Sequence, residues 1–309
     1  MDTMSTQMEH RTLGAGGPRV PVLGLGTWPL GGGMGRVDEE TAIATIRFAI
    51  DNGITMLDTA QAYRTSEATI GKALKEGYRD RCFLATKVSG DYSRAGIRAG
   101  MENSLRALDV EYVDLYQIHS WKDEYPIEEG MAEMARLQEE GKTRAIGVSN
   151  FNAAQMARAL KTARFQSNQP PYNMFNRGIE AEDIPFCERE GIGILIHSPL
   201  AKGLLTGKYA PGHVFADDDE RSRFPRFQGE TFARYLDVAG RLEEVAHARG
   251  LTLIQLAIAW ILRLPAVTCV LVGAKSPAQV KDHLRAIGVT LEEDELVCIE
   301  EILQDVPGR

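Results

Sequence analysis

The sequence predicts an α/β fold, a (β/α)8 TIM barrel whose bottom is closed by an N-terminal β-hairpin. Short apolar runs occur at eight places, as in strands that are buried on both faces. Amphipathic helical patterns lie between these runs, and alternation of this kind predicts right-handed crossovers and a parallel sheet. The length of 309 residues fits one such barrel.

The predicted strands follow one another along the chain. They are VLGLGT (22–27), TMLDT (55–59), RCFLATKV (81–88), YVDLYQIH (112–119), TRAIGVS (143–149), the weaker FQSNQ (165–169), GILIHS (193–198) and VTCVLVG (267–273). Before the first of them, HRTLGAGGPRVPVLG combines polar–apolar alternation with a glycine-rich turn. That pattern predicts the β-hairpin.

The helices between the strands have recognisable ends. Asp38 is expected to cap the first helix, which ends before Gly53, and Ser66 to cap the second, which ends near Gly77. Further helices are predicted over 93–108, 126–140, 152–163, 182–190, 276–287 and 292–304. The apolar run LTLIQLAIAWILRLP is too short to span a bilayer and is expected to be a buried helix.

Composition limits the domain number and the partners. No linker or composition break divides residues 1–309, so we expect a single domain, with 1–9 flexible and 210–230 a long mobile surface loop. A net charge of −8 argues against nucleic acid or an anionic membrane as a partner. The polar N-terminus lacks an apolar signal segment and the four cysteines are scattered, so a cytoplasmic location is expected.

Polar residues gather at the predicted strand ends, which is the catalytic face of such barrels. They are Thr27, Trp28, Asp58, Tyr63, Lys87, His119, Ser149, Asn150, Gln169, His197 and Ser198. Each of them alone has an ordinary structural reading. Asp, Lys and His at the ends of three successive units, with a tyrosine on the loop between, are harder to explain by packing.

Together, four of these residues form a plausible acid catalyst. A nearby Lys87 ammonium is expected to lower the pKa of the Tyr63 hydroxyl, and Asp58 is expected to hold that lysine. A neutral His119 can orient a carbonyl oxygen by hydrogen bonding. The predicted chemistry is protonation of an oxygen while hydride reaches the carbonyl carbon.

The hydride requires a cofactor site, and the Rossmann fingerprint is absent. Two segments suit phosphates instead. SPLAKGLLTGKY (198–209) follows a strand and has small residues that leave peptide N–H groups accessible. GAKSPAQ (273–279) supplies Lys275 and opens a helix with Ser276 as N-cap, which suits a 2′-phosphate, although Ser276 and Pro277 are equally explained as a cap alone.

At this point the sequence resembles the aldo-keto reductases over roughly residues 10 to 304. The matching motifs are LGLGTW, LDTAQAYRTSEATIG, LATKV, DLYQIHS, IGVSNF, NQPPYN, SPLAKGLLTGKY and VGAKSP. The resemblance implies NADPH-linked reduction of a small aldehyde or ketone, without a metal and with Tyr63 as the proton donor. It gives no oligomeric state, and NADH stays open as a cofactor.

The resemblance also assigns roles to other residues. Ser149, Asn150 and Gln169 would hold the nicotinamide carboxamide, and His197 would stack on its ring. The 198–207 loop would wrap the pyrophosphate, and Lys275 with Ser276 would meet the 2′-phosphate. Trp28 and Trp121 would line the substrate pocket beside Tyr63 and His119. The cofactor contacts implied in all are Thr27, Trp28, Asp58, Ser149, Asn150, Gln169, His197, Ser198, Leu200, Gly203, Gly273, Lys275, Ser276, Gln279 and His283.

Three positions depart from the family pattern. His197 replaces an aromatic residue, so we expect cofactor affinity to weaken when it is protonated. Arg64 replaces a glycine and either faces solvent or guides anionic substrates. Gln279 and His283 replace Arg and Asn at the adenosine end, which leaves the preference for NADPH open.

Two other functional classes are compatible with a barrel of this kind. The same family fold occurs in potassium-channel β-subunits, but nothing in the sequence marks a channel-docking face. A metal-dependent hydrolase using His119 and Asp58 would need a histidine–carboxylate cluster, and the sequence has no HxH pair. The reductase is therefore the leading interpretation.

Overall fold

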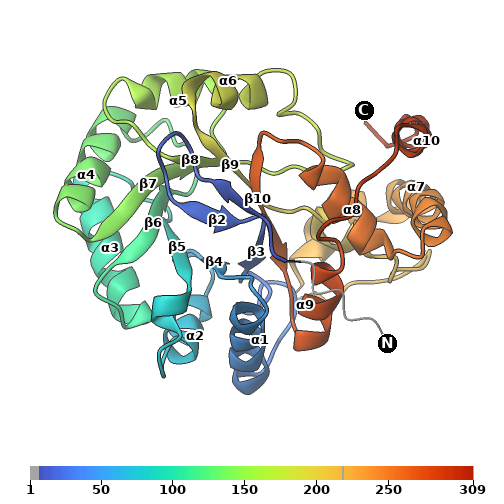
Figure 1. Cartoon of the computed structure of the whole chain (residues 1–309), viewed down its shortest axis with the longest axis horizontal. Helices are drawn as coiled ribbons and strands as arrows, with labels where there is room; N and C mark the ends of the chain where they lie inside the picture. The colour runs from blue at the N-terminus through green and yellow to red at the C-terminus, as the bar shows by residue number, and fades with distance from the viewer. Residues whose placement is uncertain (1–6, 218, 309) are drawn as a thin grey trace.

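A computed structural model describes residues 7–217 and 219–308. Eight parallel strands form a closed barrel in the order β10-β3-β4-β5-β6-β7-β8-β9 (Figure 1). They are β3 (Leu23–Gly26), β4 (Met56–Asp58), β5 (Phe83–Val88), β6 (Val113–Ile118), β7 (Thr143–Ser149), β8 (Ser167–Gln169), β9 (Gly193–Ile196) and β10 (Val267–Gly273). The predicted (β/α)8 fold is confirmed.

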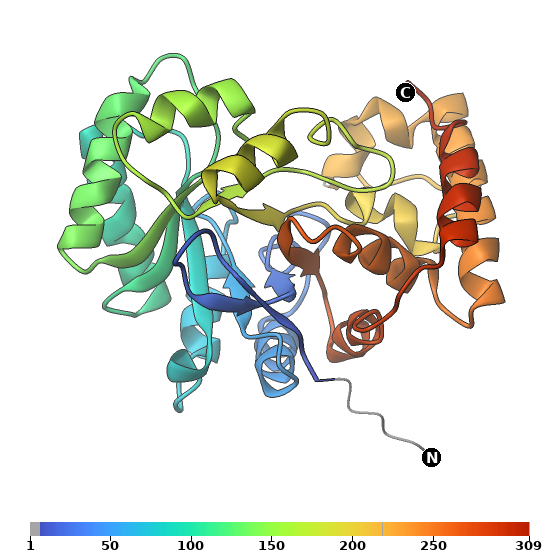
Figure 2. The same cartoon turned by 45° about the horizontal axis from the view of Figure 1, so that its top comes forward.

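Helices surround this barrel. They are α1 (Glu39–Asp51), α2 (Ser66–Ala73), α3 (Arg94–Leu108), α4 (Ile127–Glu139), α5 (Ala153–Leu160), α6 (Asp183–Glu190), α7 (Gly229–Ala248), α8 (Leu253–Leu262), α9 (Pro277–Leu284) and α10 (Glu293–Leu303). Short 3-10 turns occur at η1 (Arg79–Arg81), η2 (Ala201–Thr206), η3 (Glu220–Arg223) and η4 (Pro225–Phe227). The sequence analysis does not predict α7, which packs with α10 beside the barrel (Figure 2).

The predicted hairpin is present and lies across one end of the barrel (Figure 1). Strands β1 (His10–Thr12) and β2 (Arg19–Pro21) pair in antiparallel fashion. Leu13 and Val20 from this hairpin are fully buried. They pack against the lower layer of the barrel interior, which consists of Met56, Ala85, Leu115, Ala145, Leu195, Cys269 and Leu271. The hairpin therefore plugs the barrel bottom, and the opposite end is left for chemistry.

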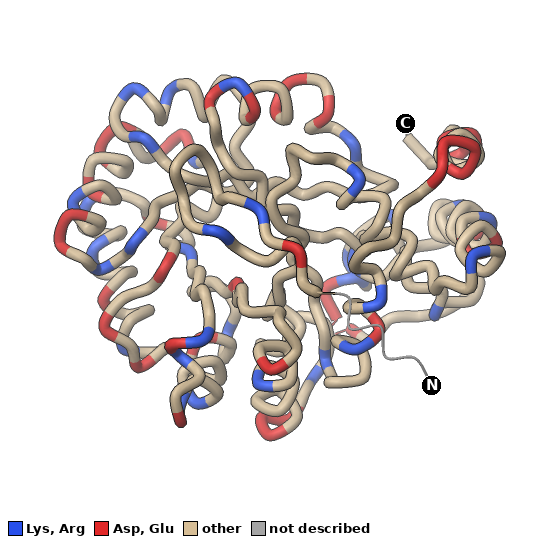
Figure 3. Tube along the Cα trace, viewed as in Figure 1, with Lys and Arg blue, Asp and Glu red and all other residues tan. Residues whose placement is uncertain are grey.

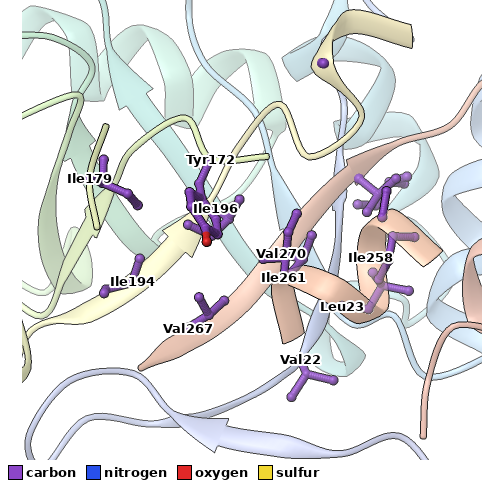
Figure 4. Close-up of a cluster of buried hydrophobic side chains, with 14 of the residues drawn as sticks. Val22, Leu23, Tyr172, Ile179, Ile194, Ile196, Ile258, Ile261, Val267 and Val270 are labelled. Atoms are coloured by element: carbon purple, nitrogen blue, oxygen red, sulfur yellow. The ribbon is translucent and has the colours of Figure 1, made fainter. Parts of the chain in front are cut away.

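A larger apolar cluster joins the outer faces of the strands to the helices. Figure 4 shows Ile194 and Ile196 of β9 and Val267 and Val270 of β10 in this cluster, with Ile258 of α8 close by. Acidic and basic residues are instead interspersed along the outer helices (Figure 3). Removal of this apolar surface from water is the main driving force for closing the barrel.

The predicted helix ends are mostly confirmed, with one correction. Asp38 caps α1, because its side chain accepts from the Thr41 N–H. Ser93 caps α3, because its side chain accepts from the Gly96 N–H. Ser66 does not cap α2. It is the first residue of the helix, and its hydroxyl is 2.7 Å from Thr27 Oγ1 inside the protein. The cap fails because a buried hydroxyl partner takes the side chain away from the helix terminus.

The segment 210–230 is more anchored than a mobile surface loop would be. It includes η3 and η4, and Phe215, Phe227 and Arg221 are buried in it. These side chains pack as a cluster, with the Arg221 guanidinium 4.7 Å from the Phe215 ring centroid. Of the segment 1–9, which the sequence analysis expects to be flexible, residues 1–6 lie outside the described residues.

Two further observations concern membranes and metals. Within the described ranges, no single helix is both long and apolar enough to cross a bilayer, and α7 and α8 meet both conditions only together, as a pair bent by 86°. In the same ranges, His, Cys, Asp and Glu nowhere gather in a group of three that could hold a metal ion.

Candidate active site

Four side chains meet at the barrel end opposite the hairpin. Asp58 ends β4, and Lys87 lies near the end of the neighbouring strand β5. His119 follows β6, whose residues pair in register with β5. Tyr63 reaches the same place from the loop between β4 and α2. The rim predicted from the strand ends is therefore present for this group.

Lys87 is the centre of the group and is fully buried. Its Nζ donates to Asp58 Oδ2 at 2.6 Å and to the Thr59 carbonyl at 2.9 Å. Burial alone would lower the pKa of Lys87, but the adjacent Asp58 carboxylate raises it above its ordinary value. The lysine therefore remains an ammonium ion in spite of its burial.

The Tyr63 hydroxyl lies 3.4 Å from Lys87 Nζ, which brings the predicted pair together. The expected net effect on the tyrosine is wrong, however. Burial raises the pKa of Tyr63, and although Lys87 lowers it, the negative charges of Asp58 and Glu220 add to the increase. The hydroxyl therefore stays protonated at neutral pH, and Lys87 partly offsets the cost of forming the phenolate.

His119 is placed beside the tyrosine, with the two ring centroids 5.7 Å apart. Burial lowers the pKa of His119 to about 3, helped by the charge of Lys87, so the ring is neutral as expected. Its Nδ1 is 2.8 Å from Ser89 Oγ, which fixes the ring orientation. Sequence reasoning missed Ser89, and its position two residues after Lys87, just past the end of β5, was the available signal.

The residues expected near the nicotinamide form a connected network. Asn150 Nδ2 donates to the His119 carbonyl at 2.9 Å, and Asn150 Oδ1 is 2.9 Å from His197 Nε2. Ser149 Oγ donates to the Gln169 carbonyl. The Gln169 amide donates to Asp58 Oδ1 at 2.8 Å. Gln169 thus holds the carboxylate that holds Lys87, a link that the sequence analysis does not predict.

The proposal that His197 titrates near neutral pH is wrong. Burial lowers the pKa of His197 to about 3, and the charges of Lys87 and Lys202 act in the same direction. Its two ring nitrogens are also taken, by Asn150 Oδ1 and by Ser198 Oγ at 2.9 Å each. The imidazole is therefore neutral across the physiological range.

We expect the affinity for NADP⁺ to be independent of pH between about 5.5 and 8 as far as His197 is concerned. The measurement is the dissociation constant from quenching of tryptophan fluorescence at several pH values, with His197→Gln as the matched variant. An affinity that falls with acid in the wild type but not in His197→Gln would contradict a neutral His197.

The loop 198–207 has an unusual backbone. Ser198, Ala201 and Lys202 have φ of 57°, 49° and 56°, and Gly203 follows with φ of 104°. Successive left-handed or turn conformations line up peptide N–H groups as an anion-binding concavity. The backbone of this loop, which contains Leu200 and Gly203, is therefore suited to a phosphate.

A second anion-binding feature lies at the end of β10. Ser276 caps α9 by accepting from the Gln279 N–H, with Pro277 in the first helical position, as predicted. Gln279 Oε1 in turn accepts from the Lys275 N–H at 2.8 Å. Lys275 lies two residues after Gly273, the last residue of β10. Its ammonium donates to the Met34 carbonyl, in the segment between β3 and α1.

Two basic residues that sequence reasoning missed lie close to Lys275. Burial lowers the pKa of Lys275, and the charges of Arg221 and Lys208 lower it further. Arg221 is held by Asp219, with Nε 2.8 Å from Asp219 Oδ1. Three cations against one carboxylate make an electropositive cluster. No spacing rule connects them, because Arg221 comes from the segment 210–230.

Several predicted contacts have other partners in the structure. The Thr27 hydroxyl donates to the Asp58 carbonyl inside the barrel. Trp121 packs edge-on against Phe151, and its indole N–H donates to Asp123 at 2.7 Å. His283 is buried in α9, where burial lowers its pKa to about 4. Their roles at the cofactor or substrate stay predictions.

Arg64 also has a defined place. Its φ is 51°, and its Nη1 donates to the Gly32 carbonyl at 3.1 Å. The side chain is otherwise exposed. Both alternatives, a solvent-facing residue and a guide for anionic substrates, remain compatible with this contact.

The residues at the rim fit a nicotinamide dinucleotide. The left-handed loop after β9 and the capped N-terminus of α9 suit its phosphates, and the basic cluster supplies countercharge. The buried polar network around Asp58 lies at the same end of the parallel barrel, so a ring bound there would be close to Tyr63 and His119.

Comparisons with known proteins agree with this geometry. The model of the aldo/keto reductase family matches residues 22–304. The chain is 41% identical over 313 residues to the aldo-keto reductase YhdN of Bacillus subtilis, covering 96% of this chain and 94% of that protein. It is 31% identical to an NADH-specific methylglyoxal reductase of Escherichia coli, with 91% of this chain and 94% of that protein covered.

A solved structure shows the same fold. The glycerol dehydrogenase of Gluconobacter oxydans superposes with a TM-score of 0.88 at 35% identity, covering 99% of this chain and 98% of that one. A family match over most of the chain and relatives above 30% identity decide the family. The chain therefore belongs to the aldo/keto reductase family, whose members are oxidoreductases that act on carbonyl compounds with nicotinamide cofactors.

Proposed function

We propose that this protein reduces an aldehyde or a ketone to an alcohol with NADPH as the hydride donor and Tyr63 as the proton donor. The observation that carries the proposal is the 3.4 Å contact between the Tyr63 hydroxyl and the Lys87 ammonium. A partly buried tyrosine beside a buried, charged lysine is arranged to lose its proton to an oxygen and to have the resulting phenolate stabilised.

The remaining groups orient the carbonyl oxygen. A Ser89 hydroxyl that donates to His119 Nδ1 leaves the ring proton on Nε2, which can then donate to the carbonyl oxygen. The neutral ring adds no charge that would compete with Lys87 for the tyrosine. When bound, the reduced nicotinamide supplies a hydride to the carbonyl carbon. Tyr63 gives its proton to the oxygen, so the product is a neutral alcohol.

The first test is turnover of simple aldehydes by the purified protein with NADPH and, separately, with NADH. We expect oxidation of NADPH that depends on the aldehyde. A protein that binds NADPH but turns over none of a broad panel of aldehydes and ketones would contradict the proposed reaction. The cytoplasmic location stays a prediction.

Replacing Lys275 by Met tests the cofactor preference. The proposed role of Lys275 is to bind the 2′-phosphate together with Ser276, because the lysine lies in an electropositive cluster at a helix N-terminus. We expect Lys275→Met to weaken NADPH binding about tenfold, or about 1.4 kcal/mol, and to leave NADH binding unchanged. Fluorescence titration with both cofactors measures this difference.

The matched control is Lys281→Met, which removes an exposed lysine of the same helix. It is expected to bind both cofactors like the wild type. An equal loss of NADPH and NADH affinity in Lys275→Met would mean that the lysine does not read the 2′-phosphate. This test matters because one relative is named for its specificity for NADH.

A further inference from the structure

Glu220 connects three parts of the molecule through one carboxylate oxygen. It is the first residue of η3, in the segment between η2 and α7. Its Oε1 accepts from Trp28 Nε1 at 3.2 Å and from Lys202 Nζ at 2.6 Å. The Glu220 side chain is 26% exposed and that of Lys202 is 31% exposed, so the ion pair is partly shielded from solvent.

Trp28, whose indole N–H donates to this oxygen, lies beside Tyr63. The indole packs edge-on against the Tyr63 ring, with centroids 5.1 Å apart and an interplanar angle of 66°. Gly33 lies against the ring so closely that a Cβ there would be 2.1 Å from Trp28 Cε2. Packing thus limits how the indole can move, and the bond from its N–H to Glu220 fixes its direction.

The charge of Glu220 also reaches Tyr63. The groups that face the tyrosine are Lys87, Asp58, Glu220 and the neutral His119. Of the three charged groups, Lys87 lowers the pKa of Tyr63, whereas Asp58 and Glu220 raise it. Asp58 is bound to Lys87 and Gln169 inside the barrel, so Glu220 is the contribution that comes from outside it.

We propose that Glu220 is a positioning residue of the active site, which orients Trp28 against Tyr63. The charge of Glu220 also favours the protonated tyrosine. Lys202 moderates this effect, because it neutralises part of the Glu220 charge from the loop that follows β9. The proposal rests on the proposed role of Tyr63 as proton donor. It gives the segment 210–230 a part in catalysis although it lies outside the barrel.

The charge is tested with Glu220→Gln, which keeps an oxygen for the Trp28 N–H and removes the negative charge. Carbonyl reduction requires a protonated Tyr63, so the rate falls as pH rises through its pKa. Without the Glu220 charge we expect this fall to move to lower pH by roughly half a unit. The measurement is kcat/KM for an aldehyde against pH at saturating NADPH.

Lys202→Met is expected to shift the pH profile in the opposite direction. Glu220 then keeps its charge without a counterion, so the fall in rate is expected at higher pH than in the wild type. A merely structural role of the ion pair would move both profiles alike or neither. Glu230→Gln is the matched control, because Glu230 is exposed in the first turn of α7, and its profile is expected to follow the wild type.

The orientation of Trp28 is tested with Glu220→Ala, which removes the acceptor as well. We expect KM for the aldehyde to rise about threefold to tenfold, the range for one hydrogen bond, whereas Glu220→Gln stays near the wild type. A shift of the tryptophan emission in Glu220→Ala but not in Glu220→Gln would report the freed indole.

The outcomes separate this inference from the proposed function. An unchanged pH profile in Glu220→Gln, or an unchanged KM in Glu220→Ala, overturns the role of Glu220 while the reductase proposal stands. Full activity of a Tyr63→Phe variant would instead exclude Tyr63 as the proton donor, and the proposed function with Tyr63 as donor would be wrong. Opposite pH shifts in Glu220→Gln and Lys202→Met, together with the KM increase, support the inference.

Discussion

Replacing Tyr63 by Phe is expected to lower kcat for carbonyl reduction by about 10²- to 10⁴-fold, the range in which one general acid contributes. The substitution removes the hydroxyl that lies 3.4 Å from Lys87 Nζ and keeps the ring that packs against Trp28. The pocket should therefore keep its shape while it loses its proton donor. Steady-state kinetics with an aldehyde and NADPH measure the loss.

Two controls accompany this variant. Fluorescence titration should show NADPH binding like that of the wild type, because the proposed cofactor contacts lie on other loops. Tyr235→Phe removes a partly buried hydroxyl of α7, which donates to the Pro307 carbonyl after α10, and is expected to keep full activity. If Tyr63→Phe retains activity within about tenfold of the wild type, another group donates the proton.

The fold could be predicted because its signals are local. Each strand of the barrel is a short apolar run, and the closed arrangement buries all eight on both faces. The catalytic group followed from the same pattern, since parallel strands bring their carboxyl ends to one rim. Asp58, Lys87 and His119 are found together for that reason, with no need to know any side-chain contact.

Contacts between distant segments were not accessible in this way. The bond from Gln169 to Asp58 joins residues 111 apart, and the bond from Trp28 to Glu220 joins residues 192 apart. Neither follows from periodicity or from a strand end. Ser66 shows the same limit in a helix cap, because its hydroxyl bonds to Thr27 and not to the helix terminus.

The pKa shifts of Tyr63 and His197 also could not be predicted from the sequence. Lys87 does act on Tyr63 in the predicted direction, but burial has the larger effect and reverses the net shift of the pKa. For His197, burial and the charges of Lys87 and Lys202 all lower the pKa. The sign of such a shift depends on how much each group is desolvated, and a sequence gives the neighbours without giving that balance.

Replacing Lys87 by Met is expected to destabilise the fold as well as to abolish most activity. Lys87 Nζ and Asp58 Oδ2 are 2.6 Å apart, and their side chains are 0% and 4% exposed. Removing one partner leaves a buried carboxylate with the Gln169 amide as its remaining side-chain bond. Breaking a buried pair in this way typically costs about 3–5 kcal/mol of unfolding free energy. Chemical denaturation of both proteins measures the difference.

The double variant Lys87→Met/Asp58→Asn separates stability from catalysis. The neutral amide has no uncompensated charge, so most of the lost unfolding free energy should return. Activity should not return, because no ammonium then lies beside the Tyr63 hydroxyl to stabilise its phenolate. Recovery of stability without turnover would show that Lys87 acts chemically as well as structurally. Recovery of both would mean that Asp58 and Lys87 only hold the barrel together, and that Tyr63 needs no cation to release its proton.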